Sequence, residues 1–180
     1  PLHVSFVGGD AGPWRVKEVR AVIGPGLPPA TKLAVIEGAP PCDASTDWVL
    51  RSSTGHLRYT TRPEVSALDA RQEGLARRAA THAALIPIRK TETWWALAQD
   101  ERRAILEEQS RHIAIGLEYL PGVARRLHHA RELGEPFDFL TWFEFAPADE
   151  PAFDELLRRL RATEEWRFVE RDVEIRLARD

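Results

Sequence analysis

The chain has 180 residues, of which 43% are hydrophobic and 29% are charged, so it can bury a core as one domain or two small fused units. The formal net charge of -3 lacks the basic excess expected of a nucleic-acid-binding protein, and no apolar run is long enough to cross a bilayer. Cys42 is the single cysteine, which excludes a disulfide within the chain.

The N-terminal third is predicted to consist mainly of short strands. Alternating or apolar segments bounded by glycine and proline indicate strands over 2–7, 14–23, 33–36, 48–51 and 57–61. A short helix is expected over 62–70, because Thr61 and Glu64 have the spacing of a capping pair. The first residues show no charged segment followed by an apolar one, so we predict a cytoplasmic location. A periplasmic location is the alternative if a signal peptide was removed.

The C-terminal half has clearer periodicity. Strands are predicted over 83–88, 123–131, 137–145 and 166–177, and an amphipathic helix over 147–161. Between the first two strands, a helix should run from about Thr91 to about Tyr119, with an interruption near Asp100. Pro87 suggests that the first of these strands lies at a sheet edge or ends there.

The order of elements predicts an α+β fold. Residues 79–180 follow the pattern strand, helix, strand, strand, helix, strand, which is the ferredoxin-like arrangement of one antiparallel sheet with helices on one face. Residues 1–78 are interpreted as a shortened, strand-rich unit of the same plan. We expect the two units to pack as one compact domain.

Three residues of this half suit a redox site, although each also has an ordinary explanation. His112 precedes an apolar helix face and could bind iron, but helix histidines are more often surface or structural residues. Arg125 suits a small oxyanion, but an arginine at a strand edge commonly reaches water. Glu165 could orient a metal-bound imidazole, but an exposed acid in a turn is the default.

Two aromatic residues and two further histidines have simpler interpretations. Trp94 and Trp95 are read as core or interface residues, with a cofactor wall as the rarer alternative. His128 and His129 are adjacent on a predicted strand and should point to opposite faces, so they are not expected to share a metal. With one cysteine and no clustered metal-ligand motif, any redox chemistry must come from a bound group.

Together, these segments resemble the chlorite dismutase family of haem b enzymes. The resemblance is carried by Ala84–Lys90, Trp94–Trp95, Ser110–Ile113, Tyr119–Pro121 with Arg125, Phe137–Glu144 and Thr163–Trp166. The length and the short N-terminal region are similar to the short, dimeric branch. The fold that this implies is a pair of ferredoxin-like units whose sheets form a barrel, a dimeric α/β-barrel type, with haem between the sheet and the helices of the C-terminal unit.

The resemblance also implies roles for individual residues. His112 would be the axial ligand of the haem iron, Glu165 would accept a hydrogen bond from it, and Arg125 would be the catalytic arginine on the opposite, distal face. The remaining residues implied to bind the cofactor are Leu127, Thr141 and Phe143 as distal walls, Gln72 as a distal glutamine, and Ile88, Lys90 and Trp94 near the haem edge and propionates.

The implied activity is conversion of chlorite to chloride and dioxygen, with Arg125 retaining a hypochlorite intermediate and with a role in detoxification. The implied partners are chlorite, other small anions at the distal site and a second copy of the chain as a homodimer. No nucleic acid or membrane partner is expected.

Several alternatives stay open. A coproheme decarboxylase of the same superfamily would lack the distal arginine and use a tyrosine, whereas Arg125 is present and the segment Ile86–Ile88 holds no tyrosine. A haem peroxidase of the same fold is not separated by sequence. A haem carrier would need His112 but not Arg125, and a cofactor-free dimer would need neither.

Overall fold

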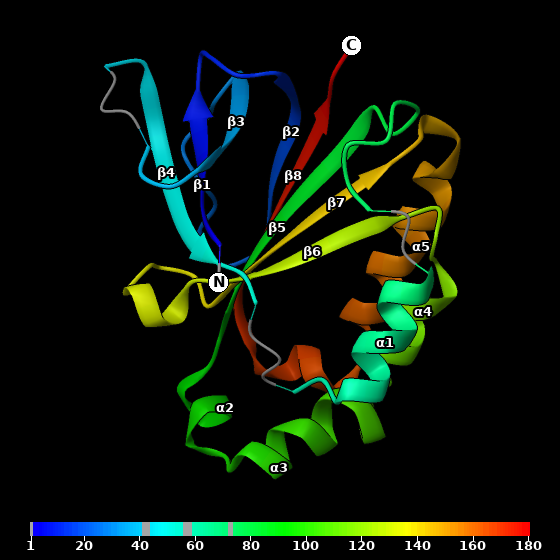
Figure 1. The fold of residues 1–180 in the computed structure, drawn as a ribbon. Helices are drawn as coiled ribbons and strands as arrows, with labels where there is room; N and C mark the ends of the chain where they lie inside the picture. Colours follow the sequence, from blue (N-terminus) through cyan, green and yellow to red (C-terminus); the bar gives the residue numbers. More distant parts are fainter. Residues whose placement is uncertain (1, 41–43, 56–58, 72–73) are drawn as a thin grey trace.

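The computed structural model describes residues 2–40, 44–55, 59–71 and 74–180, and these form an antiparallel barrel of eight strands (Figure 1). The strands are β1 (His3–Gly9), β2 (Trp14–Ile23), β3 (Lys32–Glu37), β4 (Thr46–Ser53), β5 (His82–Lys90), β6 (Ala124–His129), β7 (Phe139–Phe145) and β8 (Val169–Ala178). The α-helices are α1 (Arg62–Arg71), α2 (Glu92–Ala96), α3 (Gln99–Arg103), α4 (His112–Glu118) and α5 (Glu150–Arg161). The predicted α+β barrel architecture is therefore confirmed.

Each half of the chain contributes four neighbouring strands in the same relative order. The order is β4-β1-β3-β2 in the first half and β8-β5-β7-β6 in the second. The halves join along a long β2–β8 pairing that runs from Arg15 opposite Ala178 to Ile23 opposite Asp172. On the other side β4 and β6 share one pair, Ser53 opposite His129. The barrel is thus closed by one extensive seam and one short seam.

Strand alternation divides the buried side chains into two cores. The barrel interior is filled by residues such as Phe6, Trp14, Leu85, Trp142 and Ile175. The alternate positions of the C-terminal sheet face outward and pack against helices. That outer core includes Ile86, Ile88, Phe139, Phe143, Phe153, Leu156, Leu157 and Leu160.

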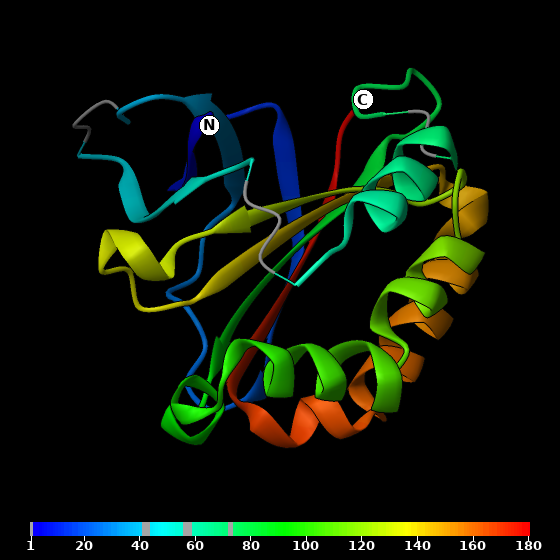
Figure 2. The same cartoon turned by 60° about the horizontal axis from the view of Figure 1, so that its bottom comes forward.

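The helices gather over the C-terminal sheet, as both views show (Figures 1 and 2). Helix α5 buries Phe153, Leu156, Leu157 and Leu160, which recur on one face at helical spacing, as the sequence predicted. Helix α4 contacts α1 on one side and α5 on the other. The C-terminal sheet and its helices therefore enclose a layer in which a site can form.

The long helix expected between the first two C-terminal strands is divided. The interruption predicted near Asp100 falls between α2 and α3, where Ala98 occupies the N-cap position of α3 and donates its backbone N–H to Glu101 Oε1. A π-helical segment, η1 (Ala104–Gln109), then continues α3. A second, unpredicted break follows at Arg111, which adopts a left-handed backbone with φ of 54°. His112 is consequently the first residue of a separate helix.

Three further expectations need correction. The strand with Pro87 is not at an edge, because β5 pairs with β7 on one side and β8 on the other. A proline removes a single N–H donor, and the pairs around it hold the strand. The last strand, predicted from residue 166, begins only at Val169, because a 3₁₀ helix, η4 (Glu164–Phe168), which contains Glu165, precedes it. Of the strand predicted over 57–61, residues 59–61 are not extended into a sheet and 57–58 lie outside the described residues.

Two short 3₁₀ helices complete the described elements, η2 (Arg131–Leu133) and η3 (Pro147–Asp149). Within the described ranges, no helix combines the length and apolar character needed to cross a membrane.

Candidate functional site

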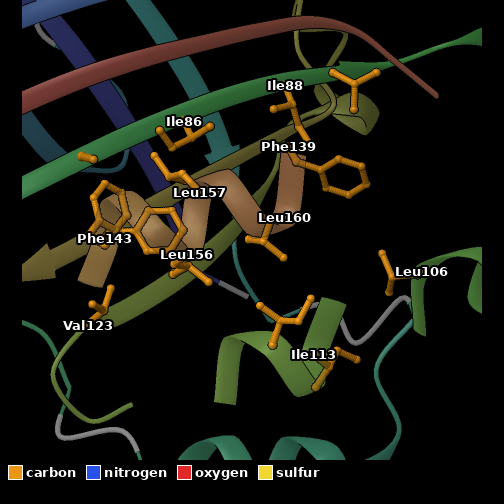
Figure 3. Packing of buried hydrophobic residues seen from close by; sticks show 14 of the residues in the cluster. Ile86, Ile88, Leu106, Ile113, Val123, Phe139, Phe143, Leu156, Leu157 and Leu160 are labelled. Atoms are coloured by element: carbon orange, nitrogen blue, oxygen red, sulfur yellow. The ribbon is translucent and has the colours of Figure 1, made fainter. Parts of the chain in front are cut away.

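A cavity of about 390 Å³ lies between the outward face of the C-terminal sheet and helices α4 and α5, and its volume is within the range of small-molecule sites. Figure 3 shows its apolar surroundings: Ile86, Ile88, Phe139 and Phe143 come from the strands, and Ile113 comes from α4 on the opposite side. The residues singled out from the sequence that line this cavity are His112, Glu165, Arg125, Ile88, Lys90, Leu127, Thr141 and Phe143. Gln72 lies outside the described residues.

The strand register places the expected distal residues in one patch. Arg125 is opposite Phe143, and Leu127 is opposite Thr141. Directly opposed residues of antiparallel strands point to the same face, so these four side chains share the side that faces α4 and α5. Ile86 extends the patch, because it is opposite Thr141 on the other side of β7. Alternation alone therefore brings these residues to one wall of the cavity.

At the other wall, Glu165 joins two basic side chains. Its Oε1 lies 2.6 Å from His112 Nδ1, and its Oε2 accepts a hydrogen bond of 2.7 Å from Lys90 Nζ. Glu165 and Lys90 are 2% and 3% exposed, so this ion pair is removed from water, whereas the His112 side chain is 25% exposed and reaches the cavity. The three residues form what we call the proximal triad.

The protonation of the proximal triad follows from its charges. Burial would raise the pKa of Glu165, but its interactions with His112 and Lys90 outweigh that effect and lower the pKa to about 2. An ionised carboxylate only accepts hydrogen bonds, so the proton between Glu165 and His112 belongs to Nδ1. Nε2 is then the nitrogen of His112 that remains for a ligand in the cavity. Burial lowers the pKa of Lys90, and Glu165 and Asp138 oppose that shift.

The sequence missed the connection between Lys90 and Glu165, because the two are 75 positions apart in the chain. It also missed Asp138, whose Oδ2 accepts hydrogen bonds from the Lys90 backbone N–H at 2.7 Å and from Trp95 Nε1 at 3.1 Å. Trp94 is fully buried and is not among the cavity-lining residues. The Lys90 ammonium lies 4.0 Å from the centre of the Trp94 ring. Trp94 thus stands behind the cavity wall and supports Lys90.

Arg125 lies on β6, across the cavity from α4. Burial lowers the pKa of its guanidinium, which nevertheless stays charged at any physiological pH because arginine starts from so high a value. Gly116 follows His112 by one helical turn and therefore shares its face of α4. A Cβ added at Gly116 would lie 4.0 Å from Arg125 Nε. The helix thus presents His112 and bare backbone to the cavity, and the Arg125 side chain extends from β6 toward that backbone.

The neighbouring histidines are separated as predicted. His129 lines the cavity, whereas His128 is buried with its ring 4.9 Å from that of Phe6. His128 Nε2 accepts a hydrogen bond of 3.0 Å from Arg126 Nε, and its Nδ1 lies 3.0 Å from Ser52 Oγ. Burial, together with the charge of Arg126 and the neighbouring His129, lowers the pKa of His128 to about 3. His128 is therefore a neutral barrel residue that connects β6 to β4.

Comparison with known proteins gives consistent matches. The family model described as chlorite dismutase matches residues 45–180. A chlorite dismutase of Ideonella dechloratans is 33% identical over 84 residues, which are 47% of this chain and 27% of that protein, so the match spans about a quarter of that relative's length. The crystal structure of a dimeric chlorite dismutase from Nitrobacter winogradskyi is 54% identical with a TM-score of 0.91, covering 98% of this chain and 99% of that one. A mutant chlorite dismutase from Candidatus Nitrospira defluvii, 19% identical with a TM-score of 0.65, shares the fold over 99% of this chain and 91% of that one.

Proposed function

Because this chain belongs to the chlorite dismutase family, we propose that it is a haem b-dependent enzyme that converts chlorite to chloride and dioxygen. The observation that carries the proposal is one apolar cavity with an imidazole–carboxylate pair, His112 and Glu165, on one wall and a cation, Arg125, on the other. The first suits an axial iron ligand and the second suits a small anion.

The residues present fit a haem group. A neutral imidazole with Nε2 directed away from its carboxylate partner is the common axial donor to haem iron. The apolar side chains of β5, β7 and α5 suit a macrocycle, and Gly116 keeps the α4 side free of a further side chain. We therefore propose His112 as the axial ligand, and Ile88, Lys90, Leu127, Thr141, Phe143 and, from the resemblance, Gln72 as further cofactor contacts. Trp94, which the resemblance also implies, would act through Lys90 from behind the cavity wall.

Haem, when bound, would supply the redox-active iron at which the chlorite oxygen–chlorine bond is broken. Glu165 would hold the proton on His112 Nδ1 and make the imidazole a more electron-rich ligand. Lys90 would offset part of the Glu165 charge, so that the ring is held as a neutral imidazole. The proximal triad thus sets how strongly the chain donates electrons toward the cofactor.

Arg125 would bind the anion and its products at the opposite wall. A permanent cation beside apolar side chains in a cavity holds a small oxyanion more strongly than the same cation would at the surface. Chlorite carries both oxygen atoms of the dioxygen product, so a hypochlorite fragment must stay beside the other oxygen until the O–O bond forms. We assign that retention to Arg125.

The alternative activities within the fold make less use of these residues. A haem carrier would need His112 but has no requirement for Arg125 beside the cofactor. A haem peroxidase would use both residues, so activity separates it from a dismutase. A coproheme decarboxylase is not favoured, because no tyrosine lies in Ile86–Ile88.

The assembly and domain plan are part of the same proposal. The protein from Nitrobacter winogradskyi, 54% identical, is described as dimeric, which supports a homodimer here. The order β8-β5-β7-β6, with helices between β5 and β6 and between β7 and β8, supports a ferredoxin-like unit over residues 79–180. The matching order of β1–β4 supports a helix-poor relative of that unit over residues 1–78.

The test is oxygen evolution after chlorite is added to the haem-loaded protein, followed with an oxygen electrode. We expect about one O₂ per chlorite, since each chlorite contains the two oxygen atoms that recombine beside Arg125. A haem spectrum with His112-dependent ligation but without oxygen would reject the dismutase activity and favour a peroxidase or carrier.

A further inference from the structure

We propose that Glu107 is a positioning residue that fixes the orientation of His112, a role that rests on the haem ligation proposed above. Glu107 belongs to η1 and is not among the residues that line the cavity. It would therefore act on the site through the backbone rather than by contact with a ligand.

The backbone at His112 is held in an unfavourable conformation. Arg111, the residue before it, has φ of 54° and ψ of 35°. This is a left-handed backbone conformation that residues other than glycine rarely adopt. In Figure 2 the green helix that follows α3 and the yellow-green helix α4 run in different directions. Such a conformation persists only where surrounding contacts fix it.

Glu107 supplies these contacts through four hydrogen bonds. Its backbone carbonyl accepts from the N–H groups of Ser110 and Arg111. Its carboxylate accepts from Ile113 N–H at 2.9 Å through Oε2 and from Ala114 N–H at 3.0 Å through Oε1. The last two are N–H groups of the first turn of α4, which have no partner within that helix.

The cap of α4 thus comes from the preceding helix. Arg111 occupies the N-cap position but makes no side-chain capping bond there. The negative carboxylate of Glu107 also lies at the positive end of α4, where an anion is stabilising. His112 lies between the bonded N–H groups of Arg111 and Ile113, so Glu107 restrains the backbone on both sides of it.

The same break also holds the partner of His112. Ser110 Oγ accepts a hydrogen bond of 2.9 Å from the Glu165 backbone N–H. The side chain of Glu165 fixes the imidazole ring, and Glu107 fixes the backbone that carries that ring. Loss of Glu107 should therefore leave the His112 ring hydrogen-bonded to Glu165, while the backbone at His112 is no longer held in one conformation.

The first measurement uses the cofactor-free protein. In Glu107→Ala, amide hydrogen exchange of Ile113 and Ala114 should become faster than in the wild type, because their acceptor is removed. Glu108→Ala is the matched control, since Glu108 is the exposed neighbour of Glu107 on η1. It should leave exchange at both amides unchanged.

The second measurement is haem titration. Substitution of a residue that orients a metal ligand commonly weakens metal binding about 10- to 100-fold, and we expect a loss in this range for Glu107→Ala, with more than one ferric ligation state in the spectrum. Glu108→Ala should bind haem like the wild type and give one spectrum. In a His112→Gly background supplied with free imidazole, Glu107→Ala should have little further effect, because the ligand is no longer attached to α4.

The outcomes are distinguishable. A folded Glu107→Ala variant with wild-type haem affinity and spectrum would overturn the positioning role, even if its thermal stability fell. If Glu107→Ala does not fold, Glu107→Gln, which keeps one acceptor oxygen, should show the same effects in weaker form, and wild-type behaviour there would be equally decisive. Weaker haem binding in Glu107→Ala, with no oxygen from chlorite in the wild type, would keep this inference and reject the proposed activity. A wild-type protein that binds no haem through His112 would reject both.

Discussion

At the scale of single residues, the chemistry of the cavity depends on one shared carboxylate. Glu165 holds His112 through one oxygen and Lys90 through the other, so the charge that reaches the imidazole is set by the balance between the two partners. The two neighbours of Glu165 can be changed separately, which allows that balance to be measured.

We expect opposite shifts of the iron midpoint potential in two variants. Glu165→Gln should raise the potential, because a neutral amide makes His112 a weaker electron donor. Lys90→Gln should lower it, because the full charge of Glu165 then acts on the ring. Spectroelectrochemistry of the haem-loaded variants measures both. Shifts of the same sign would contradict the proximal triad as an electrostatic unit.

Glu165 should also make the free energy of unfolding depend on pH in the acidic range. The pKa of Glu165 is about 2 when folded, against an ordinary value of 4.5, so its stabilising contribution is complete above pH 4.5 and is lost as the pH falls toward 2. The difference corresponds to about 3 kcal/mol. Urea unfolding of the cofactor-free protein should show the free energy of unfolding fall between pH 4.5 and 2. In Glu165→Gln this decrease should be smaller. Equal pH dependence in the two proteins would count against the shifted pKa.

Arg125 can be tested by retention of the product. Arg125→Ala should still bind haem but release less oxygen per chlorite and bleach sooner, because hypochlorite escapes. Arg158→Ala, which removes an exposed arginine of α5, should keep the wild-type yield. The oxygen released per chlorite measures retention, and the haem absorbance after repeated chlorite additions measures bleaching. Full yield and lifetime in Arg125→Ala would remove the retention argument.

The sequence singled out residues that line this cavity, but it did not show every contact between them. His112, Arg125 and Glu165 could be proposed from residue type and resemblance, because each has a chemistry of its own. The bond between Lys90 and Glu165 could not, since it depends on how β5 and η4 meet in space. Asp138 directly precedes the apolar strand β7 and belongs to no motif, although it accepts hydrogen bonds from both the Lys90 backbone and Trp95.

At the scale of elements, α5 forms one side of the outer core and was predicted well. Its apolar residues recur at helical spacing, which the sequence displays directly. The break before α4 was not predicted, because Arg111 is not a residue type that signals a left-handed backbone and Glu107 looks like one more surface acid. The prediction that the strand with Pro87 lies at a sheet edge or ends there was also wrong. A proline removes one N–H donor, but the neighbouring residues of β5 still pair with β7 and β8.

The packing of α5 gives a prediction for stability. Phe153 is fully buried, with its ring 4.9 Å from that of Phe143 and 4.6 Å from that of Phe145. Phe153→Ala should lower the free energy of unfolding by about 3–5 kcal/mol, because it leaves a cavity in the outer core. Glu155→Ala on the exposed side of α5 should change it little. Urea denaturation measures both, and a loss below about 1 kcal/mol in Phe153→Ala would contradict the packing.

At the scale of the whole molecule, the two halves have the same strand order but unequal surroundings. The α-helices of the described residues lie over β5–β8, and the site forms in the layer between that sheet and the helices (Figure 1). The halves are joined by the long β2–β8 seam and by the single β4–β6 pair. The site thus forms on the sheet of the second half, the segment that leads from β4 into α1 adds Tyr59, Val65 and Leu68 to its lining, and strands β1–β4 complete the barrel beneath it.

The concentration of α-helices over β5–β8 determines where the chain should tolerate substitutions. The outward positions of β5–β8 contact a helix or the cavity, so substitution there should alter stability, cofactor affinity or both. The equivalent outward positions of β1–β4 have no α-helix of the described chain above them, and their variation should leave the chemistry intact. A mutational scan scored for haem retention would then separate strands β1–β4 from the rest of the chain, which includes the cavity-lining residues of α1. The outer surface of β1–β4 would be free to diversify, whereas the cavity-lining positions would be constrained by the cofactor.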